Sequence, residues 1–244
     1  MLTSFLAALQ FLTILPPIVR RPFTMSELGN SVGFFPLVGG GLGLILWGVA
    51  WGLSQLLATP VVATLILILW LLFTGAIHFD GFLDMCDGIF GGSDPESRLN
   101  IMRDHRVGAF ATAGGAVLLL LQFAALTSMP DKWLGPSLLL APIWGRWAAA
   151  QAIVWMPYAR EQGLGRAMKD HARWPQALLA TILLIPIFFF FPVAAAVAML
   201  TSIVVVMGIS IFALRRIPGL TGDVYGAIII ITEVAVLVLL TTLT

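Results

Sequence analysis

Long apolar stretches recur along this chain of 244 residues, and most are close to the ~20 residues that a helix needs to cross a bilayer. They fall at about 2–18, 34–57, 61–79, 108–128, 134–157, 176–191, 193–214 and 224–243. Only 10% of the residues are charged, against roughly 25% in an average soluble domain. The sequence therefore predicts an all-α fold, a polytopic helical integral membrane protein with about seven to eight transmembrane helices in a single domain, 1–244.

Two of these stretches are ambiguous. The first, 2–18, lacks the basic start and cleavage site of a signal peptide, and it is short enough to lie in the membrane interface instead of crossing. In 176–214, Pro186 and Pro192 interrupt one apolar tract, which is either two full spans or one broken span.

The basic residues indicate an orientation. If the spans alternate in direction, the loops 19–33, 80–107, 158–175 and 215–223 share one face and hold eleven of the 13 Lys and Arg residues. The positive-inside rule makes that face cytoplasmic and places both termini outside. The charge balance of 13 basic to 12 acidic residues gives no reason to expect nucleic acid as a partner. The single cysteine excludes an intramolecular disulfide.

An acidic stripe follows the third stretch. In a helix, Asp80, Asp84 and Asp87 stand at i, i+4 and i+7, which places them on one face. Three neighbouring carboxylates repel one another unless they share a cation, and Mg²⁺ prefers such oxygen ligands near phosphates. The stripe predicts a Mg²⁺ site with a catalytic role. The alternative is a solvated loop with three surface aspartates.

Arginines return soon after the stripe. Arg98, Arg103 and Arg106, with Asp104 between them, follow a turn in which Asp94 is the expected cap of a short helix. Guanidinium groups suit phosphate oxygens. Carboxylates for a metal and arginines for phosphate are the usual parts of a phosphoryl-transfer site. Topology alone is the other explanation of these charges.

Further polar residues lie near the same face. Arg160 follows the fifth long stretch, and Thr221 and Asp223 open the last one, where Asp223 could be only a helix cap. Two ionisable residues, Arg146 and Glu233, lie inside predicted spans, where charge is expensive and needs a partner. His78 is consistent both with a ligand and with an ordinary helix-end histidine.

Six motifs in order give the chain a family resemblance. They are Phe11-Leu12-Thr13 with Leu15-Pro16, Phe35-Pro36-Leu37-Val38-Gly39, the stretch His78 to Gly88, Ile101-Met102-Arg103-Asp104 with Arg106 and Gly108, Tyr158-Ala159-Arg160-Glu161 with Gly163-Leu164-Gly165, and Thr221-Gly222-Asp223 with Gly226-Ala227. Together they span most of the chain, which resembles the cobalamin-5′-phosphate synthases, the adenosylcobinamide-GDP ribazoletransferases of cobalamin biosynthesis. One departure is Ile230, at a position where family members often carry glutamate.

The resemblance implies a reaction and a location. The ribose 3′-hydroxyl of α-ribazole, or of its 5′-phosphate, would attack the cobinamide-linked phosphorus of adenosylcobinamide-GDP and expel GMP in a Mg²⁺-dependent transfer. The enzyme would be a multi-pass protein of the bacterial or archaeal cytoplasmic (inner) membrane, with its active site facing the cytoplasm.

The resemblance also suggests roles for the polar residues. The expected metal ligands are Asp80, Asp84 and Asp87, and either Asp104 or one aspartate of the stripe would be the general base. The expected substrate-binding residues are His78, Arg98, Arg103, Arg106, Arg146, Arg160, Thr221, Asp223 and Glu233. Oligomeric state and lower-base preference stay open.

Two other classes of protein compete with this interpretation. A membrane phosphotransferase of the CDP-alcohol type also uses aspartates with Mg²⁺, but its downstream aspartates are spaced differently. A secondary transporter would carry charge deep in its spans, whereas here only Arg146 and Glu233 lie deep and the remaining charge collects at one end.

Overall fold

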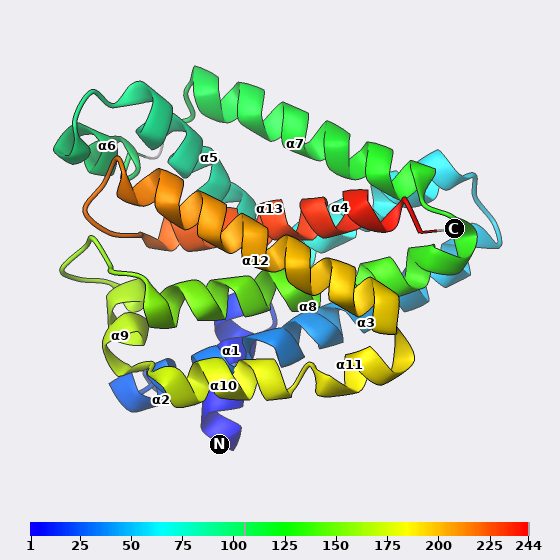
Figure 1. Ribbon diagram of the computed structural model, residues 1–244, viewed down its shortest axis with the longest axis horizontal. Coiled ribbons are helices and arrows are strands. Elements are labelled where there is room, and N and C mark those ends of the chain that lie inside the picture. Colours follow the sequence, from blue (N-terminus) through cyan, green and yellow to red (C-terminus); the bar gives the residue numbers. More distant parts are fainter. Residues whose placement is uncertain (105, 244) are drawn as a thin grey trace.

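The apolar stretches form helices that lie side by side in one bundle (Figure 1). The structure is a computed structural model that describes residues 1–104 and 106–243. The helices are α1 (Leu2–Leu12), α2 (Met25–Ser31), the 3₁₀ turn η1 (Val32–Phe34), α3 (Phe35–Ser54), α4 (Thr59–Thr74), α5 (Ile77–Gly91), α6 (Pro95–Ile101), α7 (Ala109–Ser128), α8 (Asp131–Trp155), α9 (Leu164–His171), α10 (Trp174–Ile182), α11 (Ile185–Phe190), α12 (Pro192–Leu214) and α13 (Gly222–Leu240). The predicted all-α class is confirmed.

Four helical segments in the described residues are long and apolar enough to cross a membrane: 25–54, α7, α12 and α13. Two bent pairs, α4 with α5 and α9 with α10–α11, bring the count to as many as six if each pair is one span. The tract 176–214 therefore divides unequally, because α12 is a full-length helix whereas α10 and α11 are short. A total of seven to eight spans stays a prediction.

α8 lies at the centre of the bundle, where it packs against α3, α12 and α13. Its 25 residues include an almost unbroken buried run from Gly135 to Ile153. Close packing depends on glycine, because a Cβ at Gly39 would collide with the Pro142 carbonyl and one at Gly43 would lie 2.7 Å from the Leu139 Cα. The backbones of α8 and α3 are therefore in direct contact at these glycines.

The first predicted span, 2–18, is wrong. α1 has 11 residues, about 16 Å at 1.5 Å per residue, so it is too short to cross a core of ~30 Å. A helix at the interface fits this length, and the outward placement of the N-terminus loses its basis.

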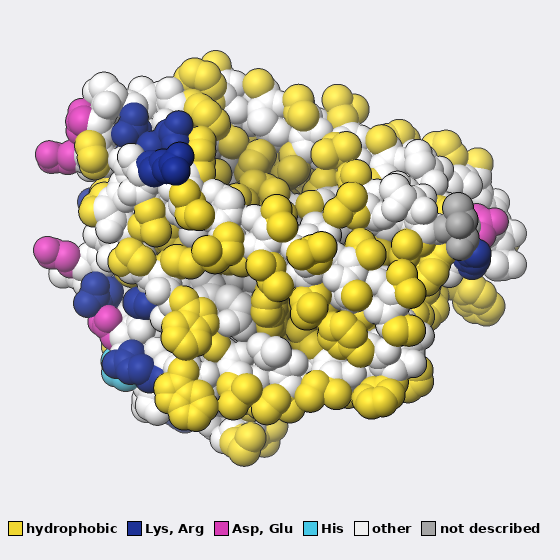
Figure 2. Space-filling model, in the orientation of Figure 1, with side chains coloured by type: hydrophobic (Ala, Val, Ile, Leu, Met, Phe, Trp, Pro, Cys, Tyr) yellow, Lys and Arg dark blue, Asp and Glu magenta, His cyan; other side chains and the backbone are white. Residues whose placement is uncertain are grey.

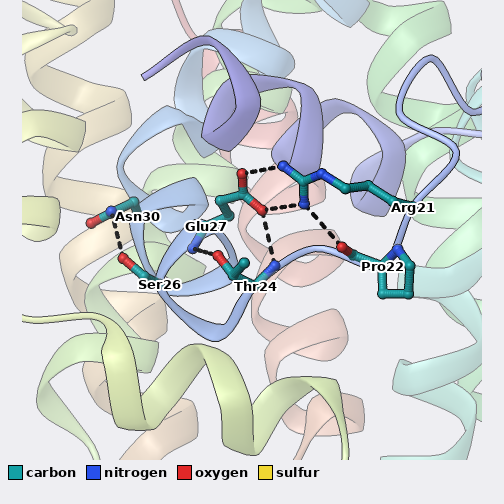
Figure 3. Close-up of polar contacts among 6 residues, drawn as sticks. All are labelled: Arg21, Pro22, Thr24, Ser26, Glu27 and Asn30. Atoms are coloured by element: carbon teal, nitrogen blue, oxygen red, sulfur yellow. Dashed lines mark hydrogen bonds and ion pairs between the residues drawn. The ribbon is translucent and has the colours of Figure 1, made fainter.

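Much of the predicted loop 19–33 is helical. Thr24 caps α2 by accepting a bond from the Glu27 N–H at 3.2 Å, and the Glu27 carboxylate accepts the Thr24 N–H at 2.9 Å (Figure 3). Arg21 closes this capping box with two bonds to Glu27 of 2.7 and 2.8 Å. Arg21 therefore has a structural role beyond orientation.

The sequence suggested that the acidic stripe continues the third span, but the structure places the stripe on a separate helix. α4 ends at Thr74, and Gly75 (φ 60°) and Ala76 (φ 54°) both adopt the left-handed conformation. The chain then turns by 88° into α5. This break directs α5 against α13 and α7. The stripe is helical, as its spacing predicted, although it lies in the segment 80–107 that connects two predicted spans.

Charged side chains gather at the left end of the molecule in Figure 2, with a small second group at the right end and a wide apolar surface between. α2, α6, α9 and the α12–α13 connection all lie at that left end (Figure 1). Hydrogen bonds join segments at this end, from Gln176 in the first turn of α10 to Asn30 of α2 (2.6 Å) and from Arg98 of α6 to the Arg216 carbonyl (3.2 Å). The predicted gathering of the basic segments at one end is confirmed, and its cytoplasmic placement stays a prediction.

Candidate active site

The stripe lies on a helix with one apolar and one acidic face. In α5, Phe82, Met85, Cys86 and Ile89 are buried against the bundle, whereas Asp80 is exposed and Asp84 and Asp87 are half-buried. The alternative of a solvated loop is therefore wrong, and the predicted helical spacing is confirmed.

Asp87 differs from Asp80 and Asp84 because its carboxylate caps the N-terminus of another helix, α7. Its oxygens accept the backbone N–H groups of Gly108 at 2.6 Å and Ala111 at 2.9 Å, which belong to the first turn of α7. Any Cβ at position 108 would lie 2.7 Å from the Asp87 Oδ1. Glycine there allows the carboxylate to cap α7, and a metal-binding role for Asp87 stays a prediction.

The two remaining stripe carboxylates face the start of α13. Asp84 interacts electrostatically with Asp80 and Asp223, which repel its negative charge, and with Arg160, which attracts it. Residues from α5, the α8–α9 connection and α13 therefore lie close enough to influence the charge of Asp84.

An ion pair organises this junction. Arg160 Nη2 donates to Asp223 Oδ2 at 2.5 Å and to the Met102 carbonyl at 3.4 Å. Thr221 donates to the same Asp223 oxygen at 3.1 Å, and its hydroxyl also caps α13 by accepting the Val224 N–H at 3.3 Å. The motif that contains Arg160 and the motif that contains Thr221 and Asp223 therefore meet at the Asp223 carboxylate.

Glycine permits the close crossing of α5 and α13. A Cβ at Gly81 would lie 2.9 Å from the Asp223 carbonyl oxygen, and one at Gly226 would lie 3.2 Å from the His78 backbone. The two helices therefore touch through their backbones beside the carboxylates, which fixes the first turn of α13 against the first turns of α5.

A cavity of about 240 Å³ opens beside this crossing. Its polar lining residues are His78, Asp80, Tyr158, Arg160, Gln162 and Asp223 together with Tyr225, and its apolar lining includes Phe11, Phe35, Ile153, Met168 and Ile229. Three buried polar atoms of these residues have no hydrogen-bond partner among the described residues: His78 Nε2, Arg160 Nε and the Tyr225 hydroxyl. Such atoms are the usual contacts for a ligand.

Sequence reasoning missed the aromatic part of the site. Tyr225 was not singled out, although both tyrosines of the chain line the cavity. The proximity of Tyr225 to the Thr221–Asp223 motif was the available signal. Burial raises the pKa of Tyr158 above its ordinary value, with Arg160 opposing the shift, so Tyr158 is a neutral hydroxyl at neutral pH.

The arginines after the stripe lie outside the cavity. Arg106 pairs with Asp104 at 2.6 Å, and its side chain is 90% exposed. Arg103 is exposed, and Arg98 is turned toward the Arg216 carbonyl. None of the three lines the cavity, and substrate binding by Arg98, Arg103 and Arg106 stays a prediction.

Arg146 and Glu233 pair with each other. Arg146 Nη1 donates to Glu233 Oε1 between α8 and α13, and both side chains are almost fully buried. Neither residue lines the cavity. Ile230, one turn before Glu233, is also buried, so the pair forms without the second glutamate. Each of these two intramembrane charges thus has the partner that it needs. Substrate binding by Arg146 or Glu233 stays a prediction.

The carboxylates fit one mode of Mg²⁺ binding. Within residues 1–104 and 106–243, no group of three or more His, Cys, Asp or Glu side chains is gathered closely enough to hold a metal ion. Mg²⁺ is commonly held by one or two carboxylates with phosphate oxygens of the substrate. Asp80 and Asp84, one helical turn apart on α5, suit that mode.

Comparison with known proteins identifies the family. Residues 4–241 match the family model for cobalamin-5-phosphate synthase. The chain is 38% identical to the adenosylcobinamide-GDP ribazoletransferase of Pseudomonas putida (strain GB-1), covering 95% of each chain. It is 37% identical to the protein of that name from Roseiflexus sp. (strain RS-1), covering 96% of this chain and 87% of the relative. No solved structure matches it. The chain belongs to the cobalamin-5-phosphate synthase family.

Proposed function

We propose that this protein is an adenosylcobinamide-GDP ribazoletransferase. A ribose hydroxyl of α-ribazole, or of its 5′-phosphate, attacks the phosphorus bonded to cobinamide. A new O–P bond forms, the O–P bond to GMP breaks, and the hydroxyl proton passes to a carboxylate. The convergence of Asp80, Asp84, Arg160 and Asp223 beside one cavity carries this proposal, with family membership in support.

The residues divide into three tasks. Asp84 would hold Mg²⁺ against the diphosphate together with phosphate oxygens of the substrate, and the metal would supply neutralisation of the developing phosphate charge. Asp80 is the stripe carboxylate that lines the cavity, so we assign it the hydroxyl proton in preference to Asp104. Arg160, already turned toward this junction, would bind a phosphate oxygen.

We also propose the setting of the reaction. The enzyme would lie in the cytoplasmic (inner) membrane as a multi-pass protein, with lipid around its apolar surface and the charged end facing the cytoplasm. The gathering of basic segments at one end supports this orientation. Both substrates would then reach the charged end of the protein from the cytoplasm.

The direct test is a reaction of the purified, detergent-solubilised protein with adenosylcobinamide-GDP, α-ribazole and Mg²⁺. Mass spectrometry should detect the joined product and GMP in equal amounts, and chelation of the metal should stop the reaction until Mg²⁺ is restored. Asp84→Asn should lose at least about 100-fold in kcat, because a transition-state charge contact is removed.

Asp94→Asn is the matched control for this assay. Asp94 caps α6 at the same charged end by accepting the Ser97 N–H at 3.0 Å, and asparagine caps a helix almost as well. This variant should stay active. Absence of product from the wild-type protein, while the Pseudomonas putida relative is active in parallel, would refute the proposed function.

A further inference from the structure

Two stacked aromatic pairs form walls of the cavity. Phe11 of α1 stacks on Phe35 of α3 with ring centroids 6.1 Å apart and an interplanar angle of 21°. Tyr158 stacks on Tyr225 of α13 at 5.8 Å and 24°. All four residues line the cavity. Flat aromatic walls of this kind favour a flat aromatic ligand.

Apolar side chains complete the enclosure. Ile153, Met168 and Ile229 line it, and each is almost fully buried. The volume of about 240 Å³ lies below the ~300–1,000 Å³ of pockets for drug-sized ligands. The cavity therefore suits a single fused ring system and is too small for a corrinoid.

One of the three unpartnered polar atoms among the cavity residues belongs to the aromatic walls. The Tyr225 hydroxyl is buried without a hydrogen-bond partner among the described residues, which is costly unless a ligand supplies one. A phenol donates readily to a ring nitrogen. Asp80, Arg160 and Asp223 line the same cavity, so a ligand held by the aromatic walls would lie beside the proposed reaction centre.

We propose that this cavity binds the base of α-ribazole, a neutral two-ring aromatic group with one ring-nitrogen acceptor. The base lies against the aromatic walls, the Tyr225 hydroxyl donates to its ring nitrogen, and the ribose is directed toward Asp80. This inference rests on the proposed function and assigns the subsite of one of its two substrates. Phe11, Phe35, Tyr158 and Tyr225 are then residues that determine base specificity.

The other aromatic group in the reaction is the guanine of adenosylcobinamide-GDP. Guanine carries several donors and acceptors on its edges, and each would need a partner when buried. The walls of this cavity are mainly apolar, which suits a base with one acceptor and disfavours guanine. The guanine would therefore lie outside this cavity, with only the diphosphate reaching Arg160.

The test measures α-ribazole binding by titration calorimetry in detergent, without the second substrate. Tyr225→Phe keeps the ring and removes one hydrogen bond, so the Kd for α-ribazole should rise about 5- to 10-fold. Ala149→Leu fills the cavity from α8, since Ala149 lines it, and should abolish α-ribazole binding. In steady-state assays the KM for adenosylcobinamide-GDP should stay unchanged in Tyr225→Phe, and thermal unfolding verifies that both variants are folded.

The outcomes separate this subsite from the proposed function. Unchanged α-ribazole affinity in both folded variants, while the wild type makes product, would overturn the subsite and leave the function standing. A weakened affinity for GMP in place of α-ribazole would assign the cavity to guanine and equally overturn the proposal. Wild-type protein that binds α-ribazole but never forms product contradicts the function and leaves the subsite standing.

Discussion

Asp84 and Asp87 lie three residues apart on α5, yet their surroundings give them different tasks. Asp87 accepts two backbone N–H groups at the start of α7, whereas Asp84 faces Asp80, Asp223 and Arg160. The first arrangement satisfies a helix end. The second leaves a group of like charges that a cation would relieve. Both are aspartates on one face of the same helix, so the distinction appears only in the fold.

This distinction predicts opposite effects of substitution. Asp87→Ala should lower the stability of the folded protein by about 1–2 kcal/mol, as losing a helix cap does, while Asp84→Asn should leave it unchanged. Thermal unfolding in detergent measures both, with exposed Glu96→Ala as the control. An Asp87→Ala protein of normal stability that requires far more Mg²⁺ for activity would show that Asp87 is a metal ligand after all.

The sequence anticipated the charged part of the site and not its aromatic part. Asp80, Arg160 and Asp223 stood out because charge is rare in this chain. Tyr225 did not, because its significance depends on stacking with Tyr158, 67 residues earlier. The pairing of Arg146 with Glu233 was likewise hidden, although the need of each for a partner was plain.

At the level of elements, the apolar stretches located α3, α7, α12 and α13 within a few residues. They failed at the α4–α5 break, since hydropathy measures the length of an apolar tract and does not detect a turn inside it. Glycine at position 75 adopts the left-handed conformation easily. Alanine rarely adopts it, so the left-handed Ala76 could not be expected from the sequence. The resulting bend is 88°, and the hydropathy of the sequence gives no sign of it.

The crossing of α5 and α13 depends on Gly81 and gives a further prediction. Gly81→Ala places a Cβ 2.9 Å from the Asp223 carbonyl, and because backbone cannot move aside, the helices must separate. Both the unfolding temperature and the activity should fall. Gly41→Ala in α3 is the control, because its Cβ would meet no described residue within 4 Å. Equal behaviour of the two variants would mean that the crossing is not tight.

At the scale of the whole molecule, charge is gathered at the two ends and the surface between them is apolar (Figure 2). Such a distribution suits a bundle whose long axis lies across a bilayer. The carboxylates and the cavity lie toward the end that carries most of the charge, so soluble, charged substrates can reach a site held by membrane helices.

Cysteine labelling in a Cys86→Ala background tests this orientation in intact cells. Membrane-impermeant reagent should reach Lys132→Cys, at the start of α8, from the outside. It should reach Asp94→Cys and Glu161→Cys only after the membrane is opened. Labelling of the latter two from opposite sides would contradict the shared face, and external labelling of both would reverse the orientation.

The Arg146–Glu233 pair has a consequence for how the protein is made. The two residues are 87 positions apart, so α8 leaves the ribosome well before its partner exists. An arginine at the centre of a helix resists transfer into lipid on its own. The charge on α8 is therefore neutralised only once α13 is in place beside it. A chain that ends before Glu233 would leave the Arg146 charge buried without its partner.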